Sequence, residues 1–486
     1  MKNHVKIMLL GIVAIFLCAC QSSPNNDVVT SKNDGAFDSN VVQSATEGCA
    51  SKTVQYSDTF ISTDGSVEIS FAIDQTVTSE PLPVVEIVPH YLTGEDVKRV
   101  AQALFGEADF YEREPDYNPQ YSASQLRDKV NMWSAYSSQE ALTELYGIDV
   151  DWSDDINIIK KYIQTFTEQL ESAPEVDPRT PCDWTLKKES TYFEIDATSN
   201  DILCATVNTE KAEYLLTGVT RNQNDFKLNG ITVKLGDGVY LPTVEQAIYR
   251  ARLCRTDTPT SDQISAVKET AQSMLNQMKL GEWLVRDAYT VTEYCGDTPE
   301  YTIRVDASPI LNGLAAVPGQ MIHDLTSVNT YTSNYYITNA YFLFSANGDL
   351  VFFGMDSPIE IKNVVNTNVA TLSMDELIEK AKTHLSLCDA KAGIGVPSGF
   401  VELYEENYGE DIVCKIEICE LVYGLGRVKA KDTEDSYYYL PVLSCKGIAN
   451  YYGKDSGELY MSSSDYGATL QNLVWINAVD GTIIEG

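Results

Sequence analysis

Residues 474–484 read VWINAVDGTII, and this stretch has the pattern of a closing β-hairpin. Asp480-Gly481 is a dipeptide that favours a tight turn between two antiparallel strands. Apolar residues stand on both sides of the turn, so both strands can contribute to a hydrophobic core. The C-terminus of the chain is therefore predicted to belong to an antiparallel sheet.

A helix is predicted upstream of this hairpin. Ser373 and Glu376 have the spacing of a capping box, and apolar residues follow at helical intervals, at Leu377, Ile378, Ala381 and Leu385. Strands are then expected at about 399–405, 411–424, 436–449 and 470–485. One helix followed by several antiparallel strands predicts an α+β module over residues 366–486, in which the helix covers one face of a curled sheet.

A second unit of the same kind precedes it, over residues 259–365. Thr260 is expected to cap a helix, with Gln263 three residues later in the capping-box position. Strands are expected at about 283–295 and 300–308. The C-terminal half therefore predicts two helix-plus-strands modules, with antiparallel sheets each covered by helices.

The N-terminal half predicts a separate α+β domain, residues 53–258. Alternating apolar residues favour strands near 67–73 and 84–88, and a helix is expected to begin at Thr93. The other expected elements are helices at about 122–146 and 153–171, strands at about 184–195, 201–208 and 213–220, and a hairpin turn at Asn229-Gly230.

The C-terminal pattern carries a resemblance to known proteins. A helix, several strands and an Asn-Ala-x-x-Gly-x-Ile-Ile hairpin, here residues 477–484, resemble the PepSY-type and YycI-type modules of Gram-positive extracytoplasmic proteins. The resemblance covers mainly residues 366–486 and, less clearly, 260–365. It implies cystatin-like folds that act as inhibitors or regulators rather than enzymes. The whole chain also resembles uncharacterised surface lipoproteins of Firmicutes, which offer no catalytic residues for comparison.

The N-terminus has the features of a lipoprotein signal peptide. Lys2 and Lys6 precede an apolar run, Ile7 to Leu17, that is about half as long as a spanning helix requires. Leu17-Cys18-Ala19-Cys20 resembles the lipobox of bacterial lipoproteins. The pattern predicts cleavage after residue 19 and lipid attachment, such as diacylglyceryl and palmitate chains, at Cys20. Residues 20–52 are rich in small polar side chains and predict a disordered tether.

The charge of the chain excludes some partners. Without Lys2 and Lys6 the mature chain carries 33 basic and 70 acidic residues, a net charge of −37. Nucleic acid is an unsuitable partner because phosphate contacts need basic patches. The predicted location is the extracytoplasmic face of the cell membrane, with the lipid on Cys20 as the membrane contact.

Nine cysteines remain after Cys18 and Cys20, which is an odd number. Their spacing shows no zinc pattern. Many stand in apolar strand-like contexts, as Cys414 and Cys419 do, so buried free thiols are favoured over a complete disulfide framework.

Templates for catalysis and metal binding fail. The histidines of the mature chain, His90, His323 and His384, lack the spacing of a local zinc site. Ser265 and Lys268 form an isolated Ser-x-x-Lys, and the acidic stretch 149–155 lacks the glycine and glutamate that an EF-hand loop needs. The sequence therefore predicts no catalytic residue, no metal site and no cofactor. Paired carboxylates of a glycosidase have no local spacing rule, so such a pair stays open.

The favoured hypothesis is a non-catalytic lipoprotein that binds or regulates an envelope protein or glycan. The alternatives are a surface hydrolase that acts on glycan through paired carboxylates and a solute-binding lipoprotein of a transporter. Tyrosine runs such as 437–439 either expose a row that contacts sugar or protein, or reflect the strand preference of tyrosine.

Overall fold

The computed structural model describes residues 42–45, 52–77, 82–113, 120–188, 200–221, 229–236, 242–295, 297–317, 339–396, 399–430, 437–466 and 470–484. Within these ranges eight α-helices accompany two β-sheets, one of ten strands and one of nine. The fold is α+β, as the sequence predicts.

The ten-stranded sheet is antiparallel throughout. Its strand order is β11-β10-β12-β13-β8-β7-β6-β4, with β9 beside β10 and β5 beside β6. The strands are β4 (Phe110–Glu112), β5 (Lys187–Lys188), β6 (Asn200–Asn208), β7 (Glu213–Arg221), β8 (Gly230–Leu235), β9 (Trp283–Cys295), β10 (Thr298–Leu311), β11 (Leu314–Ala315), β12 (Asn339–Ser345) and β13 (Leu350–Asp356).

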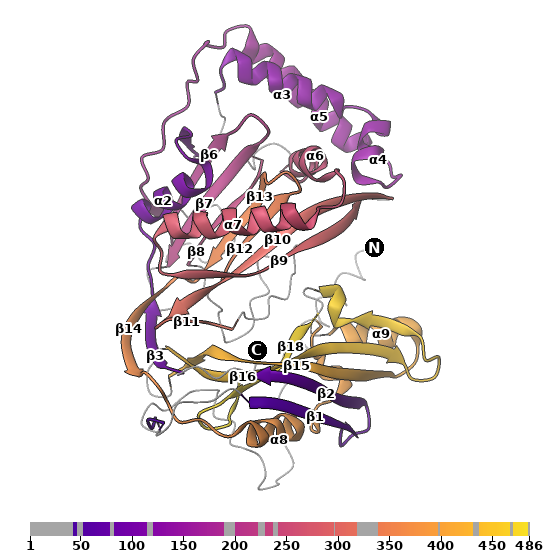
Figure 1. Cartoon of the computed structure of the whole chain (residues 1–486). Helices are drawn as coiled ribbons and strands as arrows, with labels where there is room; N and C mark the ends of the chain where they lie inside the picture. The colour runs from indigo at the N-terminus through magenta and orange to yellow at the C-terminus, as the bar shows by residue number, and fades with distance from the viewer. Residues whose placement is uncertain are drawn as a thin grey trace. The chain divides into compact units, whose positions relative to one another are not determined.

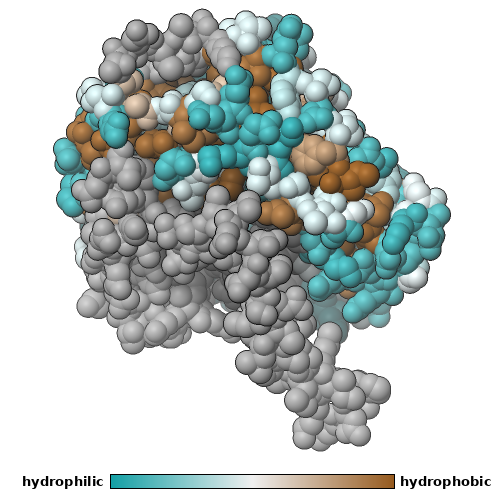
Figure 2. Space-filling model, turned by 90° about the horizontal axis from the view of Figure 1, so that it is seen from below, coloured by the Kyte–Doolittle hydropathy of each residue, from teal (hydrophilic) through white to brown (hydrophobic). Residues whose placement is uncertain are grey.

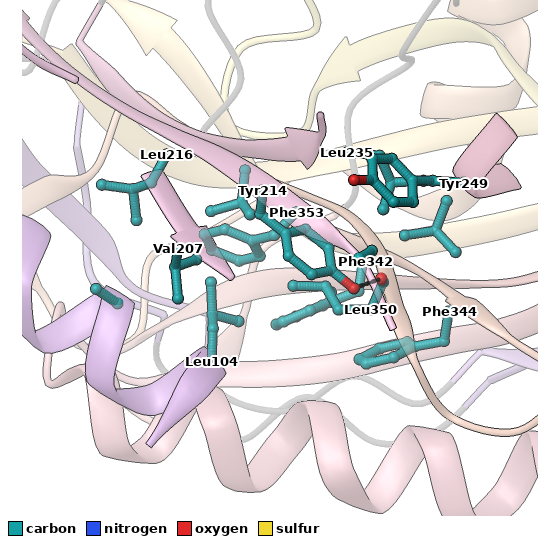
Figure 3. Packing of buried hydrophobic residues seen from close by; sticks show 14 of the residues in the cluster. Leu104, Val207, Tyr214, Leu216, Leu235, Tyr249, Phe342, Phe344, Leu350 and Phe353 are labelled. Carbon is teal, nitrogen blue, oxygen red and sulfur yellow. Dashed lines mark hydrogen bonds between the residues drawn. The ribbon is translucent and has the colours of Figure 1, made fainter. Parts of the chain in front are cut away.

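Helices cover one face of this sheet, namely α2 (Gly94–Phe105), α6 (Pro242–Cys254) and α7 (Ser261–Met278) (Figure 1). The residues beneath them stand opposite one another across six strands: Val305, Phe342, Phe353, Val233, Leu216 and Ala205. All six are fully buried. Figure 3 shows part of this core, in which the Tyr214 hydroxyl donates to the Leu350 carbonyl at 2.7 Å.

A glycine lets α2 approach the sheet closely. A Cβ on Gly218 of β7 would lie 2.5 Å from Val97 Cγ2, well inside van der Waals contact. Val97 belongs to the apolar side of α2, and it is fully buried. The absence of a side chain at position 218 therefore allows the helix to pack directly on the backbone of the strand.

Three further helices pack against the same core: α3 (Ala123–Ala135), α4 (Gln139–Tyr146) and α5 (Ser153–Leu170). A single helix was expected over 122–146, but it is interrupted at residues 136–138. Ser138 accepts a hydrogen bond from the Ala141 amide and begins α4, because a serine hydroxyl competes with the helix backbone.

The nine-stranded sheet has the order β1-β2-β15-β16-β18-β19; in addition β17 pairs with β16, and β3 pairs with β14 and β16. Its strands are β1 (Lys52–Ile61), β2 (Val67–Val77), β3 (Val84–Pro89), β14 (Ile359–Asn366), β15 (Ile412–Lys429), β16 (Tyr437–Gly453), β17 (Leu459–Ser462), β18 (Gln471–Asn477) and β19 (Ile483–Ile484). α8 (Met374–Leu385) packs on this sheet through the four apolar residues predicted for it. α9 (Phe400–Tyr408) and the short 3₁₀ turns η2 (Ala390–Ala392) and η3 (Ser463–Tyr466) complete the described elements.

The division into sheets differs from the predicted domain boundaries. Strands β1, β2 and β3 fall within the predicted domain 53–258, yet they pair with strands of the C-terminal part of the chain. β2 lies parallel to β15, with Ile69 opposite Ile416. Alternation shows that a strand exists and which side is apolar, but it carries no information about the partner strand.

Two local predictions are wrong. The stretch expected to be a strand at 399–405 is helix α9, which lies between two left-handed glycines, Gly399 (φ 84°) and Gly409 (φ 71°). Asn229-Gly230 was expected to form a hairpin turn, but Gly230 already pairs with Val219 as the first residue of β8. In both cases the short sequence pattern was compatible with two kinds of secondary structure. The conformation of the neighbouring backbone determined which of them formed.

Candidate functional site

The second face of the ten-stranded sheet, opposite α2, α6 and α7, carries polar and aromatic side chains. Along β10 the core residues alternate with Thr302, Arg304, Asp306 and Ser308. Strand pairing places Arg304 between Tyr289 and Leu343, and Asp306 beside Tyr341. Because neighbours across strands point to the same side, these side chains gather on one face.

Five of these residues form what we call the polar–aromatic cluster: Tyr289, Arg304, Asp306, Tyr341 and Phe352. The Arg304 Nε donates to both Asp306 oxygens, at 2.9 and 3.1 Å. Its guanidinium lies over the Tyr341 ring, 4.9 Å from the ring centre. Tyr341 in turn stacks on Phe352, with centroids 5.1 Å apart and planes 21° from parallel. The Tyr289 hydroxyl donates to Asp306 at 3.2 Å.

A second glycine shapes this cluster. A Cβ on Gly354 would lie 2.8 Å from Tyr341 Cε1 and 3.0 Å from the Phe352 ring. Gly354 stands directly opposite Tyr341 in the sheet. The ring of Tyr341 therefore lies against bare backbone, and any larger residue at 354 would displace it.

Burial sets the electrostatics of the cluster. Loss of solvent raises the pKa of Asp306, although the adjacent Arg304 guanidinium opposes this change. Burial, followed by the negative charge of Asp306, also raises the pKa of Tyr289 above its ordinary value. At neutral pH the tyrosine thus keeps its proton and serves as a hydrogen-bond donor. The cluster thus combines a buried arginine with half-buried aromatic rings. Arginine and tyrosine are residue types that are enriched at interfaces.

Two carboxylates also converge elsewhere in the described residues, where Glu213 and Glu245 belong to a buried charge cluster. Lys129 Nζ lies 2.9 Å from Glu213 and 3.6 Å from Glu245. Arg179 contacts Glu213 at 3.4 Å and Asp177 at 2.7 Å. The side chains of Glu213 and Glu245 are 3% and 0% exposed. These two acids face a common cation and are shielded from solvent, so the arrangement is an interior charge cluster and does not resemble a glycosidase cleft.

His90 has two carboxylate neighbours. Its Nδ1 lies 2.5 Å from Glu360 Oε1, and its Nε2 lies 3.3 Å from Asp96 Oδ2. Burial opposes ionisation of Asp96, but hydrogen bonds from Thr93 and His90 outweigh it and lower the pKa of this carboxyl group. Asp96 is also the capping-box residue of α2. His90 thus links β3, α2 and β14, a role that its sequence neighbours did not indicate.

The other predicted residues have varied outcomes. Cys20, the signal peptide 1–19 and His323 lie outside the described residues, and so does most of the tether. Ser44 within the tether forms a β-bridge with Val369, so this part of the predicted disordered stretch is ordered. Among the described cysteines, eight are free thiols, of which Cys254, Cys414 and Cys445 are buried.

The tyrosine run 437–439 is buried. Tyr437, Tyr438 and Tyr439 are 7%, 9% and 3% exposed, so they form part of the nine-stranded sheet's packing rather than an exposed row. The strand preference of tyrosine therefore accounts for this run of residues.

No group of three or more His, Cys, Asp or Glu side chains suited to a metal ion occurs in the described ranges. In these same ranges no helix combines the length and apolar character needed to cross a bilayer.

Comparison with known proteins leaves the family of this chain open. No protein-family model matches it, and no curated protein matches it either. A crystal structure of an uncharacterised protein from Eubacterium rectale ATCC 33656 is similar at 9% identity and a TM-score of 0.33, over 88% of this chain and 93% of that one. A likeness this weak supports no conclusion about function.

Proposed function

We propose that this protein is an extracytoplasmic lipoprotein, anchored to the cell membrane through Cys20, with a non-catalytic binding or regulatory role at the envelope. The anchor is supported by Leu17, Ala19 and Cys20 after a short apolar run. The strongly acidic composition suits a protein that stays soluble beside the membrane.

The polar–aromatic cluster is the observation that carries the binding role. Arginine and tyrosine are the residue types that most often dominate binding energy at interfaces, because they combine a large apolar surface with hydrogen bonding. Here Arg304, Tyr341 and Phe352 are held in fixed relative positions by Asp306 and Gly354. Arg304 is 8% exposed, whereas Tyr341 and Phe352 are half-buried, so a partner would contact the cluster through these two rings. Side chains that are already held in place lose less entropy on binding. The proposed partner is an envelope protein or a glycan.

Two experiments test this proposal. Labelling with a clickable fatty acid should mark the wild-type protein and leave Cys20→Ala unlabelled; equal labelling would refute the anchor. Affinity capture of the lipidated protein from its own membrane should then recover a reproducible partner. Arg304→Ala should lose that partner, whereas Tyr294→Ala, which removes a 72% exposed tyrosine outside the cluster, should keep it. Retention of the partner by Arg304→Ala would place the binding site elsewhere.

A further inference from the structure

The described chain passes from the nine-stranded sheet to the elements of the ten-stranded region in residues 89–94, and it returns in residues 356–359. These two crossings lie side by side, because the His90 amide donates to the Pro358 carbonyl at 2.8 Å. The His90 carbonyl accepts a hydrogen bond from the buried side chain of Asn229. The backbone of His90 is therefore fixed at the junction of the two regions, beside the pair formed by β3 and β14 (Figure 1).

Each ring nitrogen of His90 faces a carboxylate from a different region. Nδ1 lies 2.5 Å from Glu360 of β14, in the nine-stranded sheet, and Nε2 lies 3.3 Å from Asp96 of α2, which packs on the ten-stranded sheet. A neutral imidazole has one N–H group and can donate to only one of these carboxylates, whereas an imidazolium donates to both. The His90 side chain is 23% exposed, so its proton can exchange with solvent. Its protonation state therefore decides whether the ring bridges the two regions.

Other charged groups surround this junction. They are Glu86 on β3, Glu95, Asp96, Lys98 and Arg99 on α2, Asp356 on β13, and Glu360 and Lys362 on β14. Several of them are paired: the Arg99 guanidinium contacts the second oxygen of Asp96, and Lys362 Nζ lies 2.8 Å from Glu86. Asp356 also changes charge near neutral pH, because burial raises its pKa to about 6. A test of His90 therefore has to separate its effect from that of Asp356.

We propose that His90 is a pH-sensitive link between the nine-stranded sheet and α2. At about pH 5 the imidazolium form donates to both Glu360 and Asp96 and bridges β14 and α2. At about pH 8 the neutral ring donates to one carboxylate and turns a lone pair toward the other, so the bridge is broken. The crossings are then held by their backbone hydrogen bonds and by Asn229, and the junction opens more often while both sheets stay folded. This conformational response goes beyond the proposed function, because it involves no partner.

Hydrogen exchange of the full-length protein in detergent, measured at pH 5 and pH 8 and corrected for intrinsic rates, tests the proposal. The amides to follow are those of His90 and Ser357, which donate to the carbonyls of Pro358 and Asn229 at 2.8 and 2.7 Å. In the wild type their protection should fall about tenfold from pH 5 to pH 8, the scale of one hydrogen bond to a charged group. Dyes for exposed apolar surface are a poor readout, because apolar residues already lie uncovered in the described part of the face in Figure 2.

Two variants should remove the pH dependence. His90→Gln has no group at position 90 that titrates, so the protection of both amides should be the same at pH 5 and pH 8. Glu360→Gln changes a 60% exposed side chain, and its amide can hydrogen-bond to the ring in either protonation state, so protection should again be independent of pH. Circular dichroism of each variant checks that it is folded.

Two further variants are controls that should keep the tenfold change. His384→Gln removes a histidine from α8, and Asp356→Asn removes the other group that titrates near pH 6. Equal protection at both pH values in the wild type would overturn the proposal, and so would a pH dependence that survives in His90→Gln. A pH dependence that disappears in Asp356→Asn but persists in Glu360→Gln would assign the effect to Asp356, and the proposal would fail.

Discussion

The ten-stranded sheet takes its strands from one continuous stretch, residues 110–356, whereas the nine-stranded sheet combines residues 52–89 with residues 359–484. The first is antiparallel throughout, and the second contains the parallel pair β2 and β15. Pairing across more than 300 residues requires closure of a long loop before any contact is gained. The nine-stranded sheet therefore depends on both ends of the described chain, while the ten-stranded sheet depends on neither.

The two regions also differ in how they hold charge. The ten-stranded region encloses Lys129, Arg179, Glu213 and Glu245 within its interior. Ion pairs of the nine-stranded region lie nearer the surface, such as that of Lys382 with Asp58 at 2.7 Å, with side chains 24% and 37% exposed. Buried charges must be matched, because an unmatched one loses its hydration without compensation, whereas exposed pairs contribute little.

The largest expected effect separates the two sheets. Phe71→Ala should lower the free energy of unfolding by about 3–5 kcal/mol, because it empties a buried site in β2 that contacts Tyr56 and Phe60. Hydrogen exchange should show lost protection in β15 and β16, with β10 and β12 little affected. Phe342→Ala, at a fully buried site of the other sheet, should give the reverse pattern. Protection lost equally in both sheets would show that they unfold as one cooperative unit and would contradict this expectation.

Removal of one buried cation should lower the free energy of unfolding somewhat less than Phe71→Ala does. Lys129→Met keeps most of the side-chain volume but leaves Glu213 and Glu245 without the ammonium group that faces both. We expect a loss of about 3 kcal/mol in urea unfolding. Lys211→Met removes a 57% exposed partner of Asp349 and should cost less than about 1 kcal/mol. Equal effects of the two substitutions would show that the interior charge cluster contributes no more to stability than an exposed ion pair does.

Asp356 at the end of β13 predicts a pH dependence for the ten-stranded region. Burial raises the pKa of this carboxyl group from 3.8 to about 6. A raised folded-state pKa contributes stability below pH 3.8 that is lost as the pH rises through about 6. Asp356→Asn should remove that loss and be more stable than the wild type at pH 7 by about 1 kcal/mol, because Asp356 is only half-buried and solvent reduces the effect. If the difference in unfolding free energy between Asp356→Asn and the wild type were the same at every pH, this expectation would be contradicted.

Glu410 predicts a pH dependence of stability with the opposite sign in the nine-stranded region. This is the smallest of the expected effects. Its pKa of about 2 lies below the ordinary 4.5, so its contribution is present above pH 4.5 and is lost as the pH falls through about 2. The amides of Asp455 and Ser456 donate to this carboxylate at 2.9 and 3.0 Å, so in Glu410→Gln they should exchange hydrogen faster already at pH 7, as NMR can measure. The exposed control Glu402→Gln should leave these amides unchanged. Slow exchange in Glu410→Gln would show that the turn is held by other contacts.

Local patterns account for much of the fold that the sequence predicts. The capping boxes of Thr93 with Asp96, Thr260 with Gln263 and Ser373 with Glu376 are all present in the structure. The strand expected at 283–295 is β9 with the same bounds. These elements depend on residues within one or two turns of each other, so their signal is contained in a short window.

The candidate sites escaped prediction for the opposite reason. Arg304, Tyr341 and Phe352 stand on three different strands and meet only through register. His90 meets Glu360, 270 residues later in the chain, only because β3 pairs with β14. The composition did show that tyrosine is abundant, at 29 residues, but not which of them reach solvent.

By itself, the sequence determined the α+β class, the main helix starts and the strand pattern, because capping and periodicity act over a few residues. Tertiary structure alone decided that β2 joins β15, that residues 400–408 form a helix and that His90 lies between Glu360 and Asp96. Those outcomes follow from which apolar faces bury one another across long separations. That choice is made by the free energy of the whole packed chain, and no short segment encodes it.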